Sequence, residues 1–179
     1  MVALASAMLG GVRRAAAIAL ACLAPALAAC GSDDDGSSPP LANAEPAVFL
    51  SGGLDAFESR IEKERGKPIV VNKWASWCGP CRLEFLFFGS QARKRKGEVV
   101  FLGVNSNDSR GPAEEFVGEN PVPFPHFEDP NLEIAASFNA VQAFPSTAFY
   151  DSKGELAFVH QGPYATEPDL AEAIDRYAR

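Results

Sequence analysis

The amino-acid sequence predicts one α/β domain in which a central mixed β-sheet is flanked by helices. In the first half, apolar segments of strand length alternate with amphipathic helical segments, which favours parallel strands. In the second half, two strands at 146–150 and 155–160 flank the turn Asp151-Ser152-Lys153-Gly154, a pattern typical of an antiparallel hairpin. Residues 47–179 are enough for one sizeable hydrophobic core.

Local patterns define the individual elements. The segment 69–75 has too few polar residues for a surface strand, so we expect it at the centre of the sheet. Thr166 and Asp169 form a cap pair for the last helix, which is amphipathic. The other expected elements are helices at 54–64, 79–94, 112–118 and 131–138 and a strand at 98–104, with prolines marking the loops between residues 121 and 130.

The composition is that of an ordinary globular protein. The 179 residues include 47% hydrophobic and 22% charged residues, which excludes a disordered chain or a collagen-like chain. With 16 basic and 23 acidic residues the formal net charge is −7, so we expect no nucleic-acid partner, because phosphate binding needs clustered Lys and Arg.

The first residues are typical of an export signal. Arg13 and Arg14 precede an apolar, Ala-rich run at 15–29 that is short for a membrane-spanning helix, so residues 1–29 are interpreted as a signal peptide rather than a buried helix. A twin-arginine signal is a weaker alternative. The end of the run, Leu27-Ala28-Ala29-Cys30, resembles the lipobox of bacterial lipoproteins, which implies cleavage before Cys30 and lipidation of its thiol.

Residues 30–46 are rich in Gly, Ser, Asp and Pro and offer almost nothing to bury, so we expect them to form a flexible tether. The alternative for Cys30 is a coincidental cysteine after an ordinary cleavage site. With Cys22 in the signal and Cys30 assigned to lipid, the two remaining thiols are Cys78 and Cys81.

The segment Trp77-Cys78-Gly79-Pro80-Cys81 carries the predicted chemistry. A pair of cysteines separated by two residues, at the end of a buried strand and the start of a helix, is typical of a redox site. The helix N-terminus favours the Cys78 thiolate and is expected to lower its pKa from the usual value of about 8.5. Cys81 lies on the same helical face, so Cys78 would attack a partner disulfide and Cys81 would resolve the mixed disulfide.

Two other roles for the pair are open. A purely structural disulfide would close so short a loop that it would stabilise the fold only weakly. A structural zinc site usually needs four ligands, and His126 and His160 lack ligand-like spacing to each other or to the pair. We therefore expect no metal and no cofactor, and we interpret both histidines as ordinary loop and strand residues.

Residues 70–82, VVNKWASWCGPCR, resemble the active-site segment of TlpA/ResA-type thioredoxin-like proteins. The resemblance continues through Gly103-Val104-Asn105, the segment 144–149 and the turn at 151–154. It implies a thioredoxin fold and an extracytoplasmic, membrane-tethered thiol–disulfide oxidoreductase. It also implies that Cys78 is the nucleophile, that Cys81 is the resolving thiol, and that Pro145 follows Phe144 through a cis peptide bond and faces the pair. Trp77 is expected to shield the disulfide.

The sequence departs from this family at positions that matter for proton transfer. Asn72 stands where thioredoxin has a buried Asp, and Gly103 stands where its lysine partner would lie. Gly79 and Pro80 occupy the positions between the cysteines where ResA-like members often have Glu. The sequence therefore identifies no proton acceptor for Cys81.

Lys73 is an unusual residue for a central strand. Alternation places it on one face of the strand with Val71 and Ala75, and a buried Lys is costly unless it is paired. Two interpretations are open: an ion pair with Glu84 on the following helix, or a strand edge at which Lys73 reaches water.

The functional prediction is a lipid-anchored disulfide reductase at the extracytoplasmic face of the cell membrane, acting on disulfide-containing exported proteins. The Gly-Pro pair between the cysteines resembles thioredoxin, whose reduction potential is low, about −270 mV, so reduction is the favoured direction. The resemblance implies a membrane protein that donates thiol electrons. An oxidant that forms disulfides, or a non-enzymatic copper-carrying or other metal-carrying lipoprotein on the same fold, are the alternatives.

Overall fold

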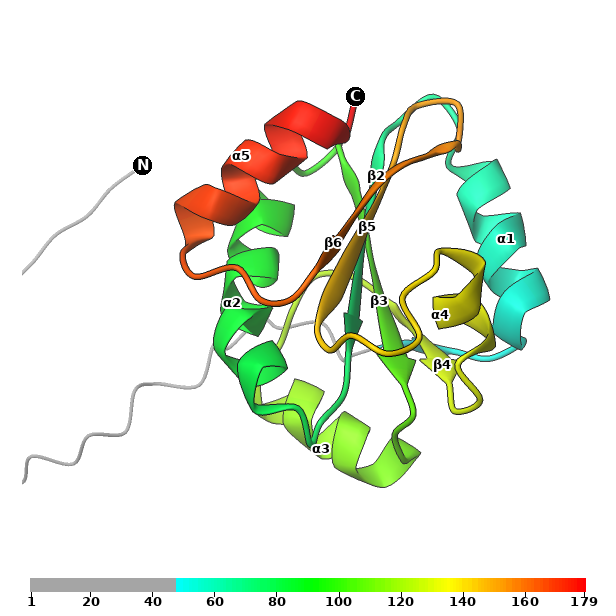
Figure 1. Ribbon diagram of the computed structural model, residues 1–179, viewed down its shortest axis with the longest axis vertical. Helices are drawn as coiled ribbons and strands as arrows, with labels where there is room; N and C mark the ends of the chain where they lie inside the picture. Colours follow the sequence, from blue (N-terminus) through cyan, green and yellow to red (C-terminus); the bar gives the residue numbers. More distant parts are fainter. Residues whose placement is uncertain (1–47) are drawn as a thin grey trace, which may run out of the picture. The chain divides into compact units, whose positions relative to one another are not determined.

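The computed structural model describes residues 48–179, which form an α/β domain with a six-stranded mixed sheet (Figure 1). The signal peptide, the lipid site at Cys30 and most of the tether lie outside the described residues. The strands are β1 (Phe49–Leu50), β2 (Ile69–Trp74), β3 (Val100–Ser106), β4 (His126–Asp129), β5 (Ser146–Tyr150) and β6 (Leu156–Gln161). The helices are α1 (Gly53–Lys63), α2 (Gly79–Lys94), α3 (Arg110–Glu119), α4 (Glu133–Ser137) and α5 (Glu167–Tyr177).

The sheet confirms the predicted fold class. Its strand order is β1-β4-β3-β2-β5-β6, so β2 lies inside the sheet, and all six of its residues are buried. The pairs β1–β4, β4–β3 and β3–β2 are parallel, whereas β5 runs antiparallel to β2 and to β6. Parallel strands need a crossover connection, which α2 provides between β2 and β3.

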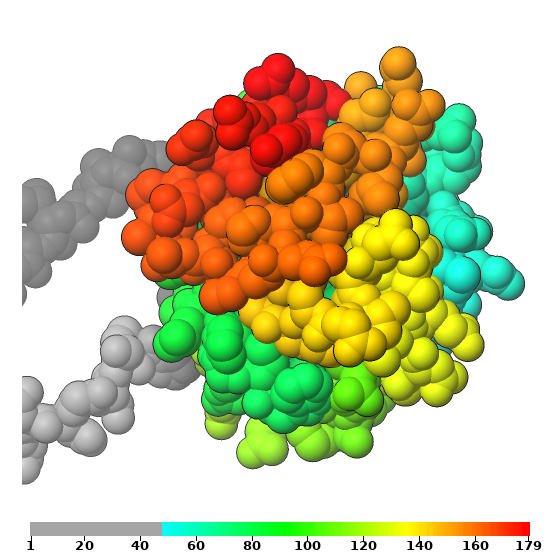
Figure 2. Space-filling model, viewed as in Figure 1, coloured from blue at the N-terminus to red at the C-terminus, as the bar shows by residue number. Residues whose placement is uncertain are grey.

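Helices cover both faces of the sheet. One hydrophobic cluster joins α2, α3 and α5 to one face and includes Val70, Phe85 and Ile174. A second cluster joins α1 and α4 to the opposite face and includes Phe57 and Val71. The exposed strand β6 forms an edge of the sheet, and in Figure 2 its orange surface lies between α5 in red and α4 in yellow.

The sequence did not predict β1 and β4. Both are short, and β4 directly follows three prolines that had marked this region as a loop. The pairing of β4 with β3 is a long-range interaction that a local pattern does not contain. The predicted cap of α5 is confirmed, since Thr166 and Asp169 form a reciprocal capping box.

Candidate functional site

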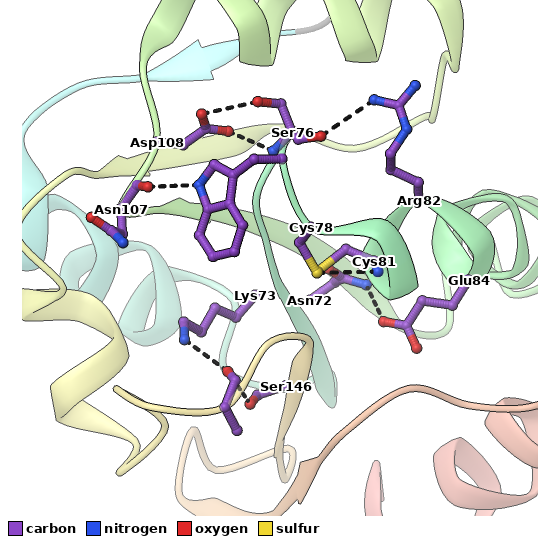
Figure 3. The surroundings of a disulfide bond; sticks show 12 residues. Asn72, Lys73, Ser76, Cys78, Cys81, Arg82, Glu84, Asn107, Asp108 and Ser146 are labelled. Atoms are coloured by element: carbon purple, nitrogen blue, oxygen red, sulfur yellow. Dashed lines mark hydrogen bonds between the residues drawn. A yellow bond between two sulfur atoms is a disulfide. The ribbon is translucent and has the colours of Figure 1, made fainter.

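The two cysteines lie where the buried strand β2 turns into α2. Cys78 is the N-cap residue of α2, and its Sγ accepts a hydrogen bond from the Cys81 backbone N–H at 3.2 Å. Pro80 occupies the first turn, where a missing N–H is not needed. Cys78 and Cys81 form a disulfide and both are buried (Figure 3). The arrangement places the disulfide at the positive end of the α2 helix dipole.

The loop before the disulfide is held by a carboxylate that the sequence analysis did not single out. Asp108 accepts hydrogen bonds from the Ser76 backbone N–H at 2.6 Å and from the Ser76 hydroxyl at 2.9 Å. It also accepts one from the Asn105 amide at 2.8 Å. The Trp77 indole donates to the Asn107 carbonyl oxygen at 2.9 Å. The β3–α3 loop therefore fixes the β2–α2 loop at two successive residues.

Trp77, the residue directly before Cys78, forms an aromatic pair with Phe144. The Phe144–Pro145 peptide bond is cis, as the family resemblance implied. The ring centroids of Trp77 and Phe144 are 4.9 Å apart, and Trp77 keeps 56% of its surface exposed. Trp77 therefore leaves an exposed aromatic surface on the residue directly before Cys78.

Lys73 is fully buried, and both interpretations of it were wrong. Its Nζ donates to three carbonyl oxygens of the segment before β5, at 2.7 Å to Ala140, 3.2 Å to Val141 and 2.9 Å to Ala143. The ammonium also lies 3.3 Å from the centroid of the Phe144 ring. Burial lowers the pKa of Lys73 to about 8, against the opposing effect of Asp129.

The physical reason for the error lies in the two faces of β2. Lys73 and Asn72 point to opposite faces of the strand, and α2 packs on the face of Asn72. Glu84 on α2 is therefore out of reach of Lys73, which points away from it in Figure 3. Lys73 instead holds, through its hydrogen bonds, the segment that leads to the cis proline.

Glu84 lies one helical turn after Cys81, on the same buried face of α2. Its Oε1 accepts a hydrogen bond from the Asn72 amide at 3.4 Å, and its Oε2 accepts one from the Tyr164 backbone N–H at 2.8 Å. Burial raises the pKa of Glu84 to about 7, although both hydrogen bonds act in the opposite direction. Figure 3 shows the hydrogen bond between the Asn72 amide and the Glu84 carboxylate among the surroundings of the disulfide.

Sequence reasoning had considered Glu84 only as a partner for Lys73. The signal that could have identified it is its spacing of three residues from Cys81, which places both side chains on one helical face. A carboxyl group with a pKa near neutrality can take a proton from a thiol or return it. Glu84 is therefore the group whose position and pKa suit proton exchange with Cys81.

His126 is a core residue of β4 and not the loop residue that the sequence suggested. Its Nδ1 accepts a hydrogen bond from the Trp74 indole at 3.2 Å, and burial lowers its pKa to about 3. Gly103 on β3 makes room for the ring, because a Cβ there would lie 2.9 Å from His126 Cγ and 2.7 Å from Cε1. The glycine at this position is thus explained by the neighbouring imidazole.

Within residues 48–179, no group of three or more His, Cys, Asp or Glu side chains is arranged to hold a metal ion. The same residues contain no helix with the length and apolar character that crossing a membrane requires.

Comparison with known proteins agrees with this geometry. Residues 43–174 match the Redoxin family. The chain is 30% identical over 132 residues to the thiol:disulfide interchange protein HelX of Rhodobacter capsulatus, a match that covers 73% of this chain and 72% of HelX. It is 28% identical over 128 residues to the sporulation thiol-disulfide oxidoreductase A of Bacillus subtilis, covering 69% of this chain and 76% of that protein.

Solved structures give the same result. MTB dsbF, determined in mixed oxidised and reduced forms, superposes with a TM-score of 0.59 at 32% identity, over 64% of this chain and 84% of that one. A DsbF homologue from Corynebacterium diphtheriae superposes with a TM-score of 0.58 at 29% identity, over 64% of this chain and 74% of that one. The chain belongs to the Redoxin family and is a thioredoxin-like thiol–disulfide oxidoreductase of the ResA/DsbE type.

Proposed function

We propose that the protein is a lipid-anchored, extracytoplasmic disulfide reductase that acts on exported proteins through Cys78 and Cys81. The observation that carries the proposal is the position of their disulfide, at the N-terminus of α2 and directly after the exposed Trp77, whose ring pairs with Phe144 of the cis peptide bond. The signal-like residues 1–29, the lipobox-like Cys30 and the tether at 30–46 support export and anchoring.

The reaction starts from the reduced pair. The Cys78 thiolate attacks one sulfur of a substrate disulfide, so a mixed disulfide forms and the other substrate sulfur leaves as a thiolate. The N-terminus of α2 and the Cys81 backbone N–H stabilise the Cys78 thiolate before the attack.

The second step resolves the mixed disulfide. Cys81 gives its proton to the Glu84 carboxylate, and its sulfur attacks Cys78 Sγ. The Cys78–Cys81 disulfide forms, and the second substrate sulfur leaves as a thiolate that takes a proton. Two protein thiols are oxidised and one substrate disulfide is reduced to two thiols. A membrane protein that donates thiol electrons would then restore the reduced pair.

Two measurements test this function. Replacing Cys81 with Ser should block the second step, so exported proteins should accumulate on Cys78 as mixed disulfides that dithiothreitol releases. The Cys78→Ser protein is the matched control and should trap nothing. A titration of the pair against glutathione or dithiothreitol should give a low potential near that of thioredoxin, about −270 mV, and a value near the −120 mV of DsbA would instead indicate an oxidant.

Lipidation is tested separately. The mass of the exported protein should show a diacylglycerol group on Cys30 with residues 1–29 removed. An unmodified Cys30 would refute the anchor and leave the redox proposal intact.

A further inference from the structure

One row of residues crosses the sheet beneath α2. In the strand register His126 of β4 lies opposite Gly103 of β3, Gly103 lies opposite Asn72 of β2, Asn72 lies opposite Thr147 of β5, and Thr147 lies opposite His160 of β6. Residues directly opposite one another in neighbouring strands point to the same face of a sheet. This polar row therefore lies on the face that carries Glu84 and the disulfide.

The row gathers polar atoms that have no partner. Among residues 48–179, the buried side-chain nitrogen and oxygen atoms without a hydrogen bond are Asn72 Oδ1, His126 Nε2, Thr147 Oγ1, His160 Nε2 and the Tyr164 hydroxyl. Four belong to the polar row. The fifth belongs to Tyr164, whose ring stacks on His160 with 4.4 Å between centroids. A buried polar atom without a protein partner is unfavourable, so the concentration of such atoms in one place needs an explanation.

Direct contacts connect the row to the proton acceptor. Glu84 accepts hydrogen bonds from the Asn72 side chain and from the Tyr164 backbone. The Tyr164 hydroxyl adjoins the Thr147 hydroxyl, although the two do not meet in good hydrogen-bond geometry. Burial raises the pKa of Tyr164, and the nearby Thr147 hydroxyl reduces that rise. Polar atoms that adjoin without pairing are the sites that ordered water occupies in protein interiors.

The charged and titratable groups around this path come from several elements. Cys81 and Glu84 lie on α2, Tyr164 lies in the loop before α5, and Tyr177 of α5 acts on Tyr164. His160 completes the set on β6. Together with His126 at the other end of the row, these groups are a thiol, a carboxyl, two phenols and two imidazoles, and Glu84 among them has a pKa of about 7.

The two ends of the row differ in access to solvent. His126 is fully buried, so this end of the row has no access to solvent. Because its Nδ1 accepts a hydrogen bond from the Trp74 indole, its Nε2 carries the ring proton. His160 is half-buried on the edge strand, with its Nε2 directed into the protein. An imidazole can accept a proton on one nitrogen and release it from the other.

We propose that the polar row is a proton route by which the proton taken from Cys81 leaves Glu84 through Thr147, Tyr164 and ordered water and reaches solvent at His160. The proposal rests on the proposed function and adds a path to its second step. No electrons move along the route. One proton enters from the Cys81 thiol, and one proton leaves from His160 for each mixed disulfide resolved.

The test measures the two chemical steps separately. The first step is the reaction of a Cys81→Ser protein with a disulfide-bonded peptide, and the second is the release of the reduced peptide in single turnovers of proteins that keep Cys81. Tyr164→Phe removes one hydroxyl of the route, and His160→Phe removes both nitrogens while keeping a ring to stack on Tyr164. Tyr150→Phe is the matched control, because Tyr150 is a buried tyrosine on the opposite face of the sheet.

Both route variants should slow the second step about tenfold near neutral pH and leave the first step unchanged. The effect is smaller than the 10²–10⁴-fold of a proton-transferring group itself, because Glu84 remains. The pH dependence of the second step should change in both, whereas Tyr150→Phe should match the wild type. Added imidazole should restore the rate of a His160→Ala protein and should not restore that of Tyr164→Phe.

Equal second-step rates in the wild type and in His160→Phe would overturn the route. Equal slowing by Tyr164→Phe and Tyr150→Phe would overturn it too, because the effect would then be structural. Residue 160 lies half-buried on the edge strand β6, so His160→Phe provides the test if Tyr164→Phe fails to fold. A Cys81→Ser protein that forms no mixed disulfide would instead refute the proposed function.

Discussion

Replacing Lys73 with Met is expected to free the segment that carries the cis proline while leaving the fold intact. Met has nearly the same length and removes only the ammonium group. In the wild type that ammonium holds three carbonyl oxygens, of Ala140, Val141 and Ala143, and contacts the Phe144 ring. The substitution therefore removes every polar contact that Lys73 makes with the segment.

Two large contributions of opposite sign determine the effect on stability. Three hydrogen bonds from a charged donor contribute about 1.5–3 kcal/mol each, or roughly 5–9 kcal/mol together. Removing the ammonium from water costs several kcal/mol in the folded protein, and Met avoids that cost. The free energy of unfolding should therefore fall by only about 1–3 kcal/mol, although the local restraint on the segment is lost.

The assay compares global and local effects. Urea unfolding gives the change in stability, and hydrogen exchange of the amides at 140–144 reports the freedom of the segment. For disulfide reduction of a protein substrate, KM should rise severalfold with a smaller change in kcat, because Phe144 pairs with the exposed Trp77, where we expect the substrate to dock. Lys67→Met is the matched control, because Lys67 is an exposed lysine just before β2. Unchanged hydrogen exchange and an unchanged KM in the Lys73→Met protein would show that Lys73 does not restrain this segment.

Three further outcomes are expected. Burial raises the pKa of Glu84 to about 7, so its contribution to stability is fully present below the unfolded pKa of about 4.3 and is lost as pH rises through about 7. Between about pH 4 and pH 8, the free energy of unfolding of Glu84→Gln, measured in urea, should therefore rise by about 3 kcal/mol relative to that of the wild type. Gly103→Ala should lower the free energy of unfolding by about 3 kcal/mol or more. In a double-mutant cycle, the loss of stability in the protein that carries both Gly103→Ala and His126→Ala should be at least about 1 kcal/mol smaller than the sum of the two single losses. Asp108→Ala should lower the free energy of unfolding by about 1–3 kcal/mol, because it leaves the partly buried backbone N–H of Ser76 without its partner. It should also alter Trp77 fluorescence, and no change in either measurement would refute the role of Asp108 in holding the loop.

The redox pair, the central strand and the final hairpin could be predicted because each is a local pattern. Two cysteines at the boundary between an apolar run and a helix are recognisable without knowing the rest of the fold, and the capping box of α5 is contained in four successive residues. The strand β4 could not be predicted in this way. It has four residues after a proline-rich segment, and its stability comes from pairing with β3 and from the buried His126 ring.

The error at Lys73 shows a different limit. Alternation correctly separated Lys73 from Asn72, but it does not say which of the two faces a following helix will cover. That choice depends on the handedness of the crossover from β2 through α2 to β3, which is a property of the whole sheet. The partners of Lys73 lie 67 to 70 residues away, in a segment whose position depends on β5.

In the proposed mechanism, Glu84, which accepts a hydrogen bond from Asn72, replaces the buried Asp that thioredoxin has on this strand. The amide stands on β2 and the acid on α2, so the carboxyl group remains next to the resolving cysteine although its position in the sequence has changed. A neutral amide also donates a hydrogen bond to the carboxylate without adding a second negative charge near the sulfur. Burial raises the pKa of Glu84 to about 7 against the opposing hydrogen bonds from Tyr164 and Asn72, and at that pKa proton exchange with a thiol costs little. The small residue at Gly103, opposite Asn72, is then free to accommodate His126.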